Sequence, residues 1–446
     1  MAITNIRLRQ FKCFADSGDI PLAPLTIVFG RNNTGKSTIL QSLLLLRQTI
    51  ESPEYGPRLD LRGPHYVAGT YKDIVHQHRP SQNIRMQFDI VEKRPKASVT
   101  AKIELEFTSD EPQPPRLVRL SVKCADCEPF VIRRGRGKGG PYELTIAGRS
   151  KGGETKAQFF FLPSRFFPFI GPEPSRQGRP NEKHEKSRTH ANIALRSLES
   201  SIINMRAVGA FRNQPERRYD YGGHPPKTID ARGQYVIDAL IEDVSRRGSR
   251  KGELFRGVNQ WLKLVGRVQL KPLKRISTSA SAPIYELQVR DIDSGRWANF
   301  ADVGFGIGQA LPVFVEGLRT PPGELFLVQE PEIHLHPDAQ LGMADFLVSL
   351  ARSGRRVIAE THSEHLLLRV RRKLVEAGSN GRGLSPSDVS IIHVSNTQAG
   401  NSTVTPLEMD SVAQITNWPK GFMEEATDER MALLKQMIKP SRRGGK

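Results

Sequence analysis

The sequence has few cysteines and no long apolar segment. Three cysteines among 446 residues are too few for a disulfide framework, so a reducing compartment is expected. No run of about 18 or more apolar residues occurs, which argues against a transmembrane helix. The opening residues, MAITNIRLRQF, also lack the apolar core of a secretory signal. These absences predict a cytoplasmic protein with no membrane partner.

Acidic residues are scarce relative to basic ones. The chain has 66 Lys and Arg against 47 Asp and Glu, which gives a net charge of +19 and a pI near 10.0. Residues 133–190 alone hold 13 Lys and Arg against 5 Asp and Glu. Such a chain favours a polyanionic partner, nucleic acid first. The alternative is a basic solvated surface or linker that binds nothing specific.

Hydrophobic patterns predict an α/β organisation. Residues 1–50 are typical of two strands, a glycine-rich loop and a helix, and residues 84–108 alternate like an antiparallel pair. Residues 109–190 are rich in Pro, Gly and Arg around short strand-like pieces, which indicates an inserted basic β and loop subdomain. From residue 325 strands alternate with helices, as in a mostly parallel sheet. Further helices are expected near 190–206, 232–265, 338–352 and 363–377.

The segment GRNNTGKST, residues 30–38, fits the phosphate-binding pattern G-x-x-x-x-G-K-[ST] between a predicted strand and a predicted helix. Glycines let backbone N–H groups face the phosphates, and the helix N-terminus adds partial positive charge. We expect Lys36 to reach the β- and γ-phosphates, Ser37 to bind Mg²⁺ and Thr38 to support the α-phosphate. The residues predicted to hold ATP in this loop are Gly30, Asn32, Asn33, Thr34, Gly35, Lys36, Ser37 and Thr38.

The stretch LFLVQEPEIHLHP, residues 325–337, predicts the other half of an ATP-hydrolysing site. Hydrolysis needs a group that orients Mg²⁺ and a base that polarises the attacking water. By spacing, Gln329 is the metal-side residue and Glu330 is the base. An amide lacks the negative charge that strengthens a contact with a metal-bound water, so weakened Mg²⁺ binding and slow turnover are expected. Glu332 could partly substitute.

A second strand, in RRVIAETHSEH, ends at Thr361 and His362. A histidine at the carboxyl end of the strand beside the acidic one can touch the γ-phosphate. His362 therefore joins Glu330 and Lys36 as a predicted catalytic residue. A capped helix start at Ser363 is the alternative, and both interpretations can hold together.

Two zinc interpretations compete with these assignments. Glu332, His334 and His336 could ligate zinc, but nothing nearby completes a ligand set of the usual spacing. Cys124 and Cys127 form a single C-x-x-C without a second pair, so two ordinary small residues are favoured over a zinc site.

Several separated motifs occur together in one order. They are the phosphate-binding loop, GAFRNQPERRY, DVGFGIGQALPVFV, EPEIHLHPDAQ, AETHSEHLLLRVRRK and NWPKGFMEE. In this order they resemble the ABC-type ATPase heads of the SMC, RecF and OLD class. More narrowly, they look like the prokaryotic AAA-type ATPases of the OLD-like branch. Those proteins carry a C-terminal domain of unknown function that ends in a Trp-Pro-x-Gly-Phe element. The resemblance covers most of the chain outside roughly 109–190.

The resemblance implies a P-loop NTPase fold of the ABC-type head class, with a mixed β lobe and a helical lobe. The expected units are an N-terminal ATPase lobe at 1–108, a basic insert at 109–190, a helical lobe and strand at 191–300, an ATPase lobe with signature, Walker B and switch histidine at 301–410, and a C-terminal element with a basic tail at 411–446.

The resemblance also assigns roles to residues that spacing alone does not. Gly306, Gly308 and Gln309 would lie in the signature loop, which binds the γ-phosphate of ATP held by a second copy. Family members often carry Ser in this loop, whereas here only backbone N–H groups are available, which puts robust turnover in doubt. Gln77, in YKDIVHQH, is a candidate Q-loop residue.

The partners follow from the same resemblance. A head-to-tail homodimer or a larger homo-oligomer is expected, with ATP and Mg²⁺ between the copies. A polar-aromatic cluster of Arg212, Arg217, Arg218 and Tyr219 could join the dimer surface or nucleic acid, or could be a solvated loop.

The sequence contains no acidic cluster typical of the Toprim nuclease that many OLD-like proteins append. A separate effector protein, such as a nuclease, is therefore expected, in antiviral defence or DNA repair. The competing function is a non-hydrolysing, ATP-bound scaffold or sensor that assembles partner proteins.

Overall fold

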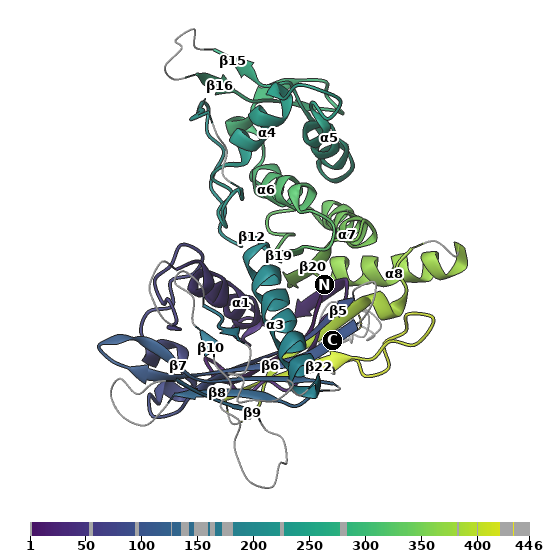
Figure 1. Ribbon diagram of the computed structural model, residues 1–446. Coiled ribbons are helices and arrows are strands. Elements are labelled where there is room, and N and C mark those ends of the chain that lie inside the picture. Colours follow the sequence, from purple (N-terminus) through teal and green to yellow (C-terminus); the bar gives the residue numbers. More distant parts are fainter. Residues whose placement is uncertain are drawn as a thin grey trace, which may run out of the picture.

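The structure is a computed structural model of one chain. It describes residues 2–52, 57–93, 98–125, 127–134, 142–146, 159–160, 166–171, 182–223, 227–276, 283–380, 383–398, 400–419 and 431. Three layers follow one another in Figure 1: a large antiparallel sheet, a central parallel sheet, and a helical lobe capped by small sheets. Among the described residues, no helix is both long and apolar enough to cross a membrane.

The antiparallel sheet has eight strands, with β3 (Ile20–Pro21) paired to β1 beside the main path. The path runs β2 (Phe14–Asp16), β1 (Ala2–Phe11), β5 (Ile84–Lys93), β6 (Ser98–Asp110), β7 (Gln113–Cys124), β8 (Phe130–Arg134) and β9 (Tyr142–Ile146). Strict alternation puts apolar side chains such as Phe88, Ile103 and Leu120 on the buried face. The predicted antiparallel pair at 84–108 is therefore confirmed.

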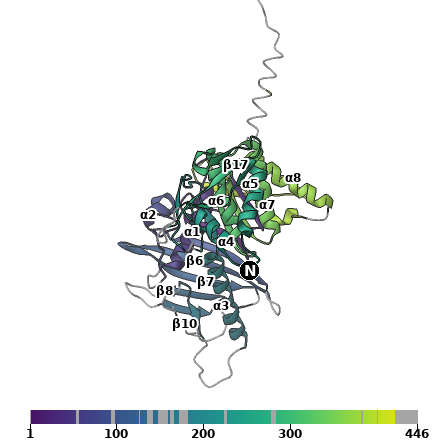
Figure 2. The ribbon, with the colours of Figure 1, turned by 90° about the horizontal axis from the view of Figure 1, so that it is seen from above.

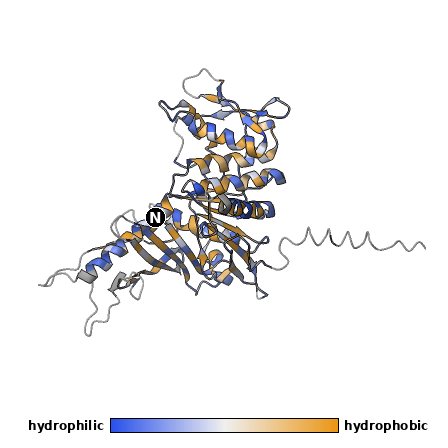
Figure 3. Ribbon diagram, turned by 90° about the vertical axis from the view of Figure 1, so that its right-hand side faces the viewer, coloured by the Kyte–Doolittle hydropathy of each residue, from blue (hydrophilic) through white to orange (hydrophobic). Residues whose placement is uncertain are grey.

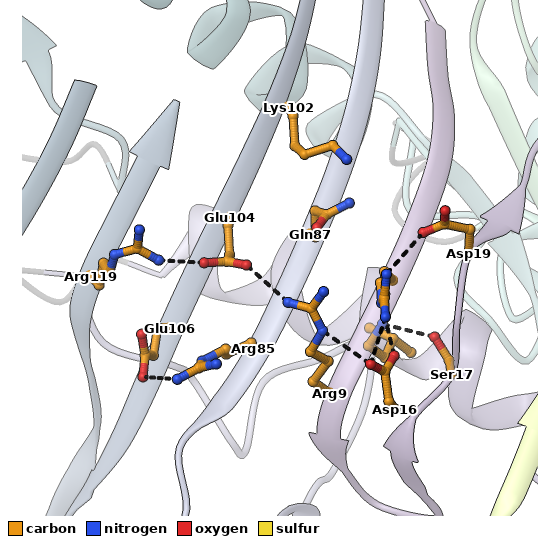
Figure 4. Close-up of polar contacts among 12 residues, drawn as sticks. Arg9, Asp16, Ser17, Asp19, Arg85, Gln87, Lys102, Glu104, Glu106 and Arg119 are labelled. Carbon is orange, nitrogen blue, oxygen red and sulfur yellow. Dashed lines mark hydrogen bonds and ion pairs between the residues drawn. The ribbon is translucent and has the colours of Figure 1, made fainter. Parts of the chain in front are cut away.

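The polar face of this sheet carries a ladder of charge pairs (Figure 4). Arg9 lies 3.2 Å from both Asp16 and Glu104, and Arg119 lies 2.5 Å from the same Glu104. Arg85 pairs with Glu106 at 3.2 Å in the next row. Because these arginines are matched by carboxylates on neighbouring strands, this part of the face is not a bare cationic surface for a phosphate backbone.

The predicted insert is not a separate unit where the structure describes it. β7, β8 and β9 extend the N-terminal sheet, with Leu105 opposite Leu120 and Ile103 opposite Val122. The predicted boundary at 108 falls inside β6, and that at 190 falls inside α3 (Glu182–Ile203). The alternating pattern of LVRLSVKC continues the pattern of β6, which is why it joins the same sheet. Most of the basic residues between 135 and 181, and the C-terminal tail, lie outside the described residues.

The central sheet confirms the expected, mostly parallel arrangement. Its order is β12 (Arg206–Val208), β19 (Leu325–Gln329), β20 (Arg356–Thr361), β4 (Leu25–Phe29), β21 (Val389–Asn396) and β22 (Ser402–Leu407), and only β22 runs antiparallel. Both faces are covered, so the strands are nearly continuous apolar runs. Val28, Leu327 and Ile358 face the core shared with the antiparallel sheet, α1 (Lys36–Glu51) and α3. Their neighbours Ile27 and Phe326 face the helical core.

The helical lobe packs on that second face (Figures 1 and 2). It contains α4 (Val236–Ser245), α5 (Glu253–Gly266), α6 (Phe305–Arg319), α7 (Pro337–Arg352) and α8 (Glu364–Asn380). The stretch expected to be helical at 232–265 is two helices, because the chain turns through Gly248 and Gly252 at positive φ. Phe346 ties the lobe together, with ring centroids 5.1 Å from Trp261 and 4.9 Å from Phe314.

Small elements complete the fold. Two three-stranded sheets cap the helical lobe, β13 (Tyr219–Asp220), β16 (Ile284–Glu286) and β15 (Lys274–Arg275), and β14 (Val268–Leu270), β17 (Gln288–Asp291) and β18 (Trp297–Asn299). A short pair, β10 (Phe159–Phe160) and β11 (Phe169–Ile170), and a short helix, α2 (Tyr71–Ile74), lie on the antiparallel lobe. Figure 3 shows apolar residues concentrated where the layers meet.

Candidate active site

The glycine-rich loop lies between β4 and α1, as its pattern predicts. Gly30 has φ 150° and Gly35 has φ 97°. A Cβ atom at residue 30 would collide with the carbonyl of Val394, and one at residue 35 would collide with Cys13 Sγ. Both glycines are therefore required by backbone conformation and by close approach. The Val394 carbonyl packs against Gly30, and the Cys13 side chain packs against Gly35.

The loop presents donors to an anion. Gly35 caps α1 without a side-chain hydrogen bond, so no cap side chain occupies the first-turn N–H groups. Lys36 Nζ donates to the Arg31 carbonyl at 2.7 Å, and Thr34 Oγ1 donates to the same oxygen at 2.9 Å. Lys36 is buried, which lowers its pKa, while Glu360, Glu330 and Glu332 oppose that shift. The lysine thus lies beside a group of carboxylates.

The other predicted loop residues differ in exposure. Asn32 and Asn33 are exposed, and Asn33 has φ 60°. Thr38 is buried, and the Cys13 thiol donates to its hydroxyl at 3.5 Å. Its expected contact with the α-phosphate stays a prediction.

Strand order brings the two halves of the site together. β20 lies between β4 and β19, so the carboxyl ends of all three parallel strands meet at one edge. Glu360, on β20, is opposite Gln329 in the register. Ser37 Oγ donates to Glu360 Oε1 at 2.5 Å, and Gln329 Nε2 donates to Glu360 Oε2 at 2.9 Å. One carboxylate therefore joins the predicted metal residue of the loop to the predicted metal residue of β19.

The predicted base and the predicted switch histidine are close. Glu330 Oε1 lies 3.8 Å from His362 Nε2, and both side chains are about one-third exposed. Glu330 has φ 44°, a conformation that non-glycine residues rarely adopt. Residues in such strained conformations cluster at functional sites. Its N–H donates to the Glu360 carbonyl at 2.8 Å, which holds the turn after β19.

The pKa of His362 is lowered from its ordinary value, first by burial and then by Lys36, so the imidazole is neutral at pH 7. The next residue confirms the capped helix start as well. Ser363 Oγ accepts from the Leu366 N–H at 3.0 Å. The capped helix start is therefore present, and contact between His362 and the γ-phosphate stays a prediction.

Glu332 is buried, and one of its carboxylate oxygens is held by the turn between β20 and α8, so its role as a substitute acid stays a prediction. It is 8% exposed, and its Oε1 accepts from Thr361 Oγ1 at 2.7 Å, from the His362 N–H at 2.7 Å and from the Ser363 N–H at 3.2 Å. These bonds fix the turn between β20 and α8. Burial raises the pKa of Glu332. Its carboxylate therefore positions His362 through the backbone.

Arg212 is not part of an exposed cluster, contrary to the sequence-based interpretation. It is 7% exposed and donates to the carbonyls of Gln309 at 3.0 Å, Gln329 at 2.6 Å and Glu330 at 3.1 Å. Burial lowers its pKa to about 10. By contrast, Arg217 is exposed and pairs with Asp302. Arg212 therefore ties the end of β19 to the start of α6.

The predicted signature loop is the first turn of α6. Gly308 and Gln309 are buried, and Gln309 Nε2 donates to the Arg212 carbonyl at 3.4 Å. A Cβ atom at Gly306 would collide with the His334 carbonyl, so close packing explains that glycine. The exposed part of the turn is Gly304 and Phe305. Contact between this loop and the phosphate of a second copy therefore stays a prediction for the backbone around Gly306, and the buried Gln309 side chain does not face outward.

The remaining sequence hypotheses can be placed. Gln77 is exposed and has φ 53°, in a segment that pairs with Phe11 through a bridge at Val75, and its Q-loop role stays a prediction. Among the described residues, no group of three or more His, Cys, Asp or Glu is arranged to hold a metal, which argues against both zinc interpretations. Cys127 Sγ instead lies 3.2 Å from His190 Nδ1.

Glu360 is the site residue that sequence reasoning missed. The signal was a single acidic letter at the end of the apolar run RRVIAE. Only the order of the strands shows that this letter lies between the loop and Gln329.

Two models of known ATPase families match the segments that contain the two halves of this site. Residues 1–207 match the model described as "AAA ATPase domain", and residues 239–369 match "AAA domain, putative AbiEii toxin, Type IV TA system". Residues 384–433 match "Protein of unknown function (DUF3696)", which covers the Trp-Pro element at 418–419. No curated protein matches.

Solved structures similar to the chain are SMC heads. One is an SMC head bound to the C-winged helix domain of ScpA, at 13% identity and a TM-score of 0.45, covering 92% of this chain and 98% of that one. Another is the SMC head domain from Thermotoga maritima, at 11% and 0.40, covering 92% and 100%. A third, derived from Pyrococcus furiosus, is an Smc head domain with an extended coiled coil bound to the C-terminal domain of ScpA, at 12% and 0.43, covering 98% and 99%.

These similarities are too distant to describe the site, which is built from this chain's own residues. The loop between β4 and α1, the parallel sheet and the two family matches support ATP binding. The chain is an α/β protein with a P-loop between β4 and α1, and it is similar to AAA ATPase domains over residues 1–207 and 239–369.

Proposed function

We propose that the chain hydrolyses ATP slowly, closes on ATP as a head-to-tail homodimer, contacts nucleic acid, and controls a separate effector protein. The observation that carries the hydrolytic part is the convergence of Lys36, Glu330 and His362. They come from the loop after β4 and from the ends of β19 and β20, and Glu330 lies 3.8 Å from His362. These are a phosphate-binding cation, a base for water and a histidine for the γ-phosphate.

The residues present fit Mg²⁺. The site offers oxygen donors, the Ser37 hydroxyl and the Glu360 carboxylate, which are 2.5 Å apart. Glu360, Glu330 and Glu332 each raise the pKa of Lys36 through their charge, so the site favours an added cation. When bound, the ion would neutralise charge on the phosphates. Glu330 would then orient the attacking water and accept its proton.

Two substitutions test hydrolysis. Lys36→Ala should abolish ATP binding, because the cation that faces the phosphates is lost. Glu330→Gln keeps the shape of the side chain but removes the base, so turnover should fall by about 10²–10⁴-fold while ATP still binds. Arg217→Ala, an exposed position away from the loop, is the matched control. Wild-type turnover in Glu330→Gln would show that another group activates water.

Dimerisation is supported by the exposed first turn of α6. Gly304 caps this helix without a side-chain hydrogen bond, and Phe305 is 42% exposed beside it. A helix N-terminus of this kind suits a phosphate held by another copy. Light scattering of Glu330→Gln with ATP should report a dimer, and Lys36→Ala should stay monomeric. If the molar mass of Glu330→Gln is the same with and without ATP, the proposed ATP-dependent dimerisation is wrong.

Two observations support nucleic-acid contact and a defence or repair role. The net charge of +19 favours a polyanion, and the matched AbiEii description belongs to a toxin–antitoxin family. Replacing Arg136 and Lys138, between β8 and β9, with alanine should flatten the salt dependence of DNA affinity. An unchanged slope would place the contact elsewhere. A nuclease gene beside the coding sequence would favour defence over repair.

The second candidate function is a non-hydrolysing ATP-bound scaffold or sensor. Gln329 favours it, because an amide is present at the metal-side position of β19. Gln329→Asp discriminates between the two candidates. A large gain in turnover would show that the native site is tuned for binding, and little gain would favour the hydrolytic head.

A further inference from the structure

The acid that is missing from the end of β19 is present one strand away. Gln329 and Glu360 are opposite each other in the parallel register of β19 and β20. Their side chains are hydrogen bonded at 2.9 Å, with the amide donating to the carboxylate. The site therefore contains the amide and the carboxylate side by side, with the acid on the strand nearer to the phosphate-binding loop.

The position of Glu360 follows from strand order. β20 is flanked by β4 on one side and β19 on the other, so its last residues lie between the loop and Gln329. Glu360 is 2% exposed, and each of its carboxylate oxygens has one donor, Ser37 Oγ at 2.5 Å or Gln329 Nε2 at 2.9 Å. The Ser37 hydroxyl is the loop's expected Mg²⁺ ligand, and it lies directly on this carboxylate.

The other two carboxylates have different partners. Glu330 faces His362 at 3.8 Å, as a base for water would. Glu332 accepts three hydrogen bonds in the turn before α8. Of the three acids near Lys36, only Glu360 contacts Ser37 in the part of the chain that the structure describes.

We infer that Glu360 supplies the carboxylate of the Mg²⁺ site, and that Gln329 is the positioning residue that holds this carboxylate by its amide. This inference rests on the proposed ATP site and deepens it. The acid has moved from β19 to β20, and the site keeps its negative charge within reach of the Ser37 hydroxyl. The amide at Gln329 therefore does not mean that the Mg²⁺ site lacks an acid, because Glu360 supplies it from the neighbouring strand.

The test uses the full chain and a non-hydrolysable ATP analogue, AMP-PNP, with and without metal. Glu360→Gln keeps the size of the side chain and can still bond to Gln329. Mn²⁺ affinity of the AMP-PNP complex, measured by electron paramagnetic resonance, should fall by about 10–100-fold. AMP-PNP affinity in EDTA should not fall, because removing a negative charge reduces the electrostatic repulsion of a triphosphate.

A matched control and a reciprocal swap sharpen the result. Glu364→Gln removes the same charge from the first turn of α8 and should leave Mn²⁺ affinity unchanged. The double variant Gln329→Glu with Glu360→Gln exchanges the two groups and keeps one amide bonded to one carboxylate. It should recover most of the lost Mn²⁺ affinity, because the charge returns to the same pair of side chains.

The outcomes are distinguishable. Wild-type Mn²⁺ affinity in Glu360→Gln overturns the inference, as does an equal loss of AMP-PNP affinity with and without metal, which would indicate a structural role. If the double variant Gln329→Glu with Glu360→Gln does not recover Mn²⁺ affinity, the inference is also wrong. If wild-type protein fails to bind AMP-PNP under any condition, the proposed function fails first, and the roles of Glu360 and Glu330 fall with it.

Discussion

Replacing Arg212 with alanine should strongly destabilise the protein, although sequence reasoning groups this residue with exposed arginines. Its guanidinium donates to four carbonyl oxygens, those of Gly209 at 2.8 Å, Gln309 at 3.0 Å, Gln329 at 2.6 Å and Glu330 at 3.1 Å. Three of these acceptors belong to the active-site edge, the end of β19 and the first turns of α6. Loss of the cation would leave them without their common donor.

The magnitude follows from opposing contributions. Hydrogen bonds to a charged group contribute about 1.5–3 kcal/mol each, so four give roughly 6–12 kcal/mol gross. Burial lowers the pKa of Arg212 to about 10, and that loss of solvation offsets about 3 kcal/mol. Water that enters the vacated space recovers part of the rest. We expect a net loss of about 3–5 kcal/mol, as for other broken buried charge contacts.

Urea unfolding followed by circular dichroism measures this loss through the shift in midpoint at constant slope. Arg217→Ala is the matched control, because the Arg217–Asp302 pair is exposed and should contribute about 0–1 kcal/mol. Arg212→Lys should lie between the two, since one ammonium cannot reach all four oxygens. If Arg212→Ala destabilises the protein no more than Arg217→Ala does, the hydrogen bonds of Arg212 do not hold the end of β19 to the start of α6.

Three further substitutions test other contacts. Gly35→Ala should abolish ATP binding in a folded chain, because φ is 97° and the new methyl collides with Cys13; retained binding would contradict the close approach. Maleimide labelling of Cys13 should be slowed by ATP and should block nucleotide binding, and a Cys13→Ser chain should resist the reagent. The buried carboxylate of Glu316 lies 3.4 Å from Arg206 and 3.5 Å from Arg319. Glu316→Ala leaves both arginines without this partner and should lower the free energy of unfolding by about 3–5 kcal/mol. Urea unfolding measures this loss, and Glu316→Gln should lose less.

Local motifs were predictable from sequence because their physics is local. The loop at 30–38 needs glycines at fixed spacing, and the structure has positive φ at Gly30 and Gly35. The alternating strands after residue 325 predicted the parallel sheet for the same reason. His362 was expected after the strand beside the acidic one, and the structure has β20 next to β19 with His362 3.8 Å from Glu330.

Features that depend on the order of strands or on burial were not predictable. The importance of Glu360 depends on β20 lying between β4 and β19, which no spacing reveals. Arg212 and Arg217 are five residues apart in one polar segment, yet one is buried and the other exposed. The boundary at 108 was placed where composition changes, but pairing of β6 with β7 runs across it.

The order of the central sheet also constrains how the protein is made. β4 has β20 and β21 as its two neighbours, and the Ser37–Glu360 contact joins residues 323 positions apart. At roughly 5–20 residues per second, the ribosome needs about 15–65 s to span that gap. During this interval an apolar strand has both edges unpaired, so the nascent chain is a natural client for chaperones. A polypeptide released before β19 is made would carry the phosphate loop but none of the acids Glu330, Glu332 and Glu360.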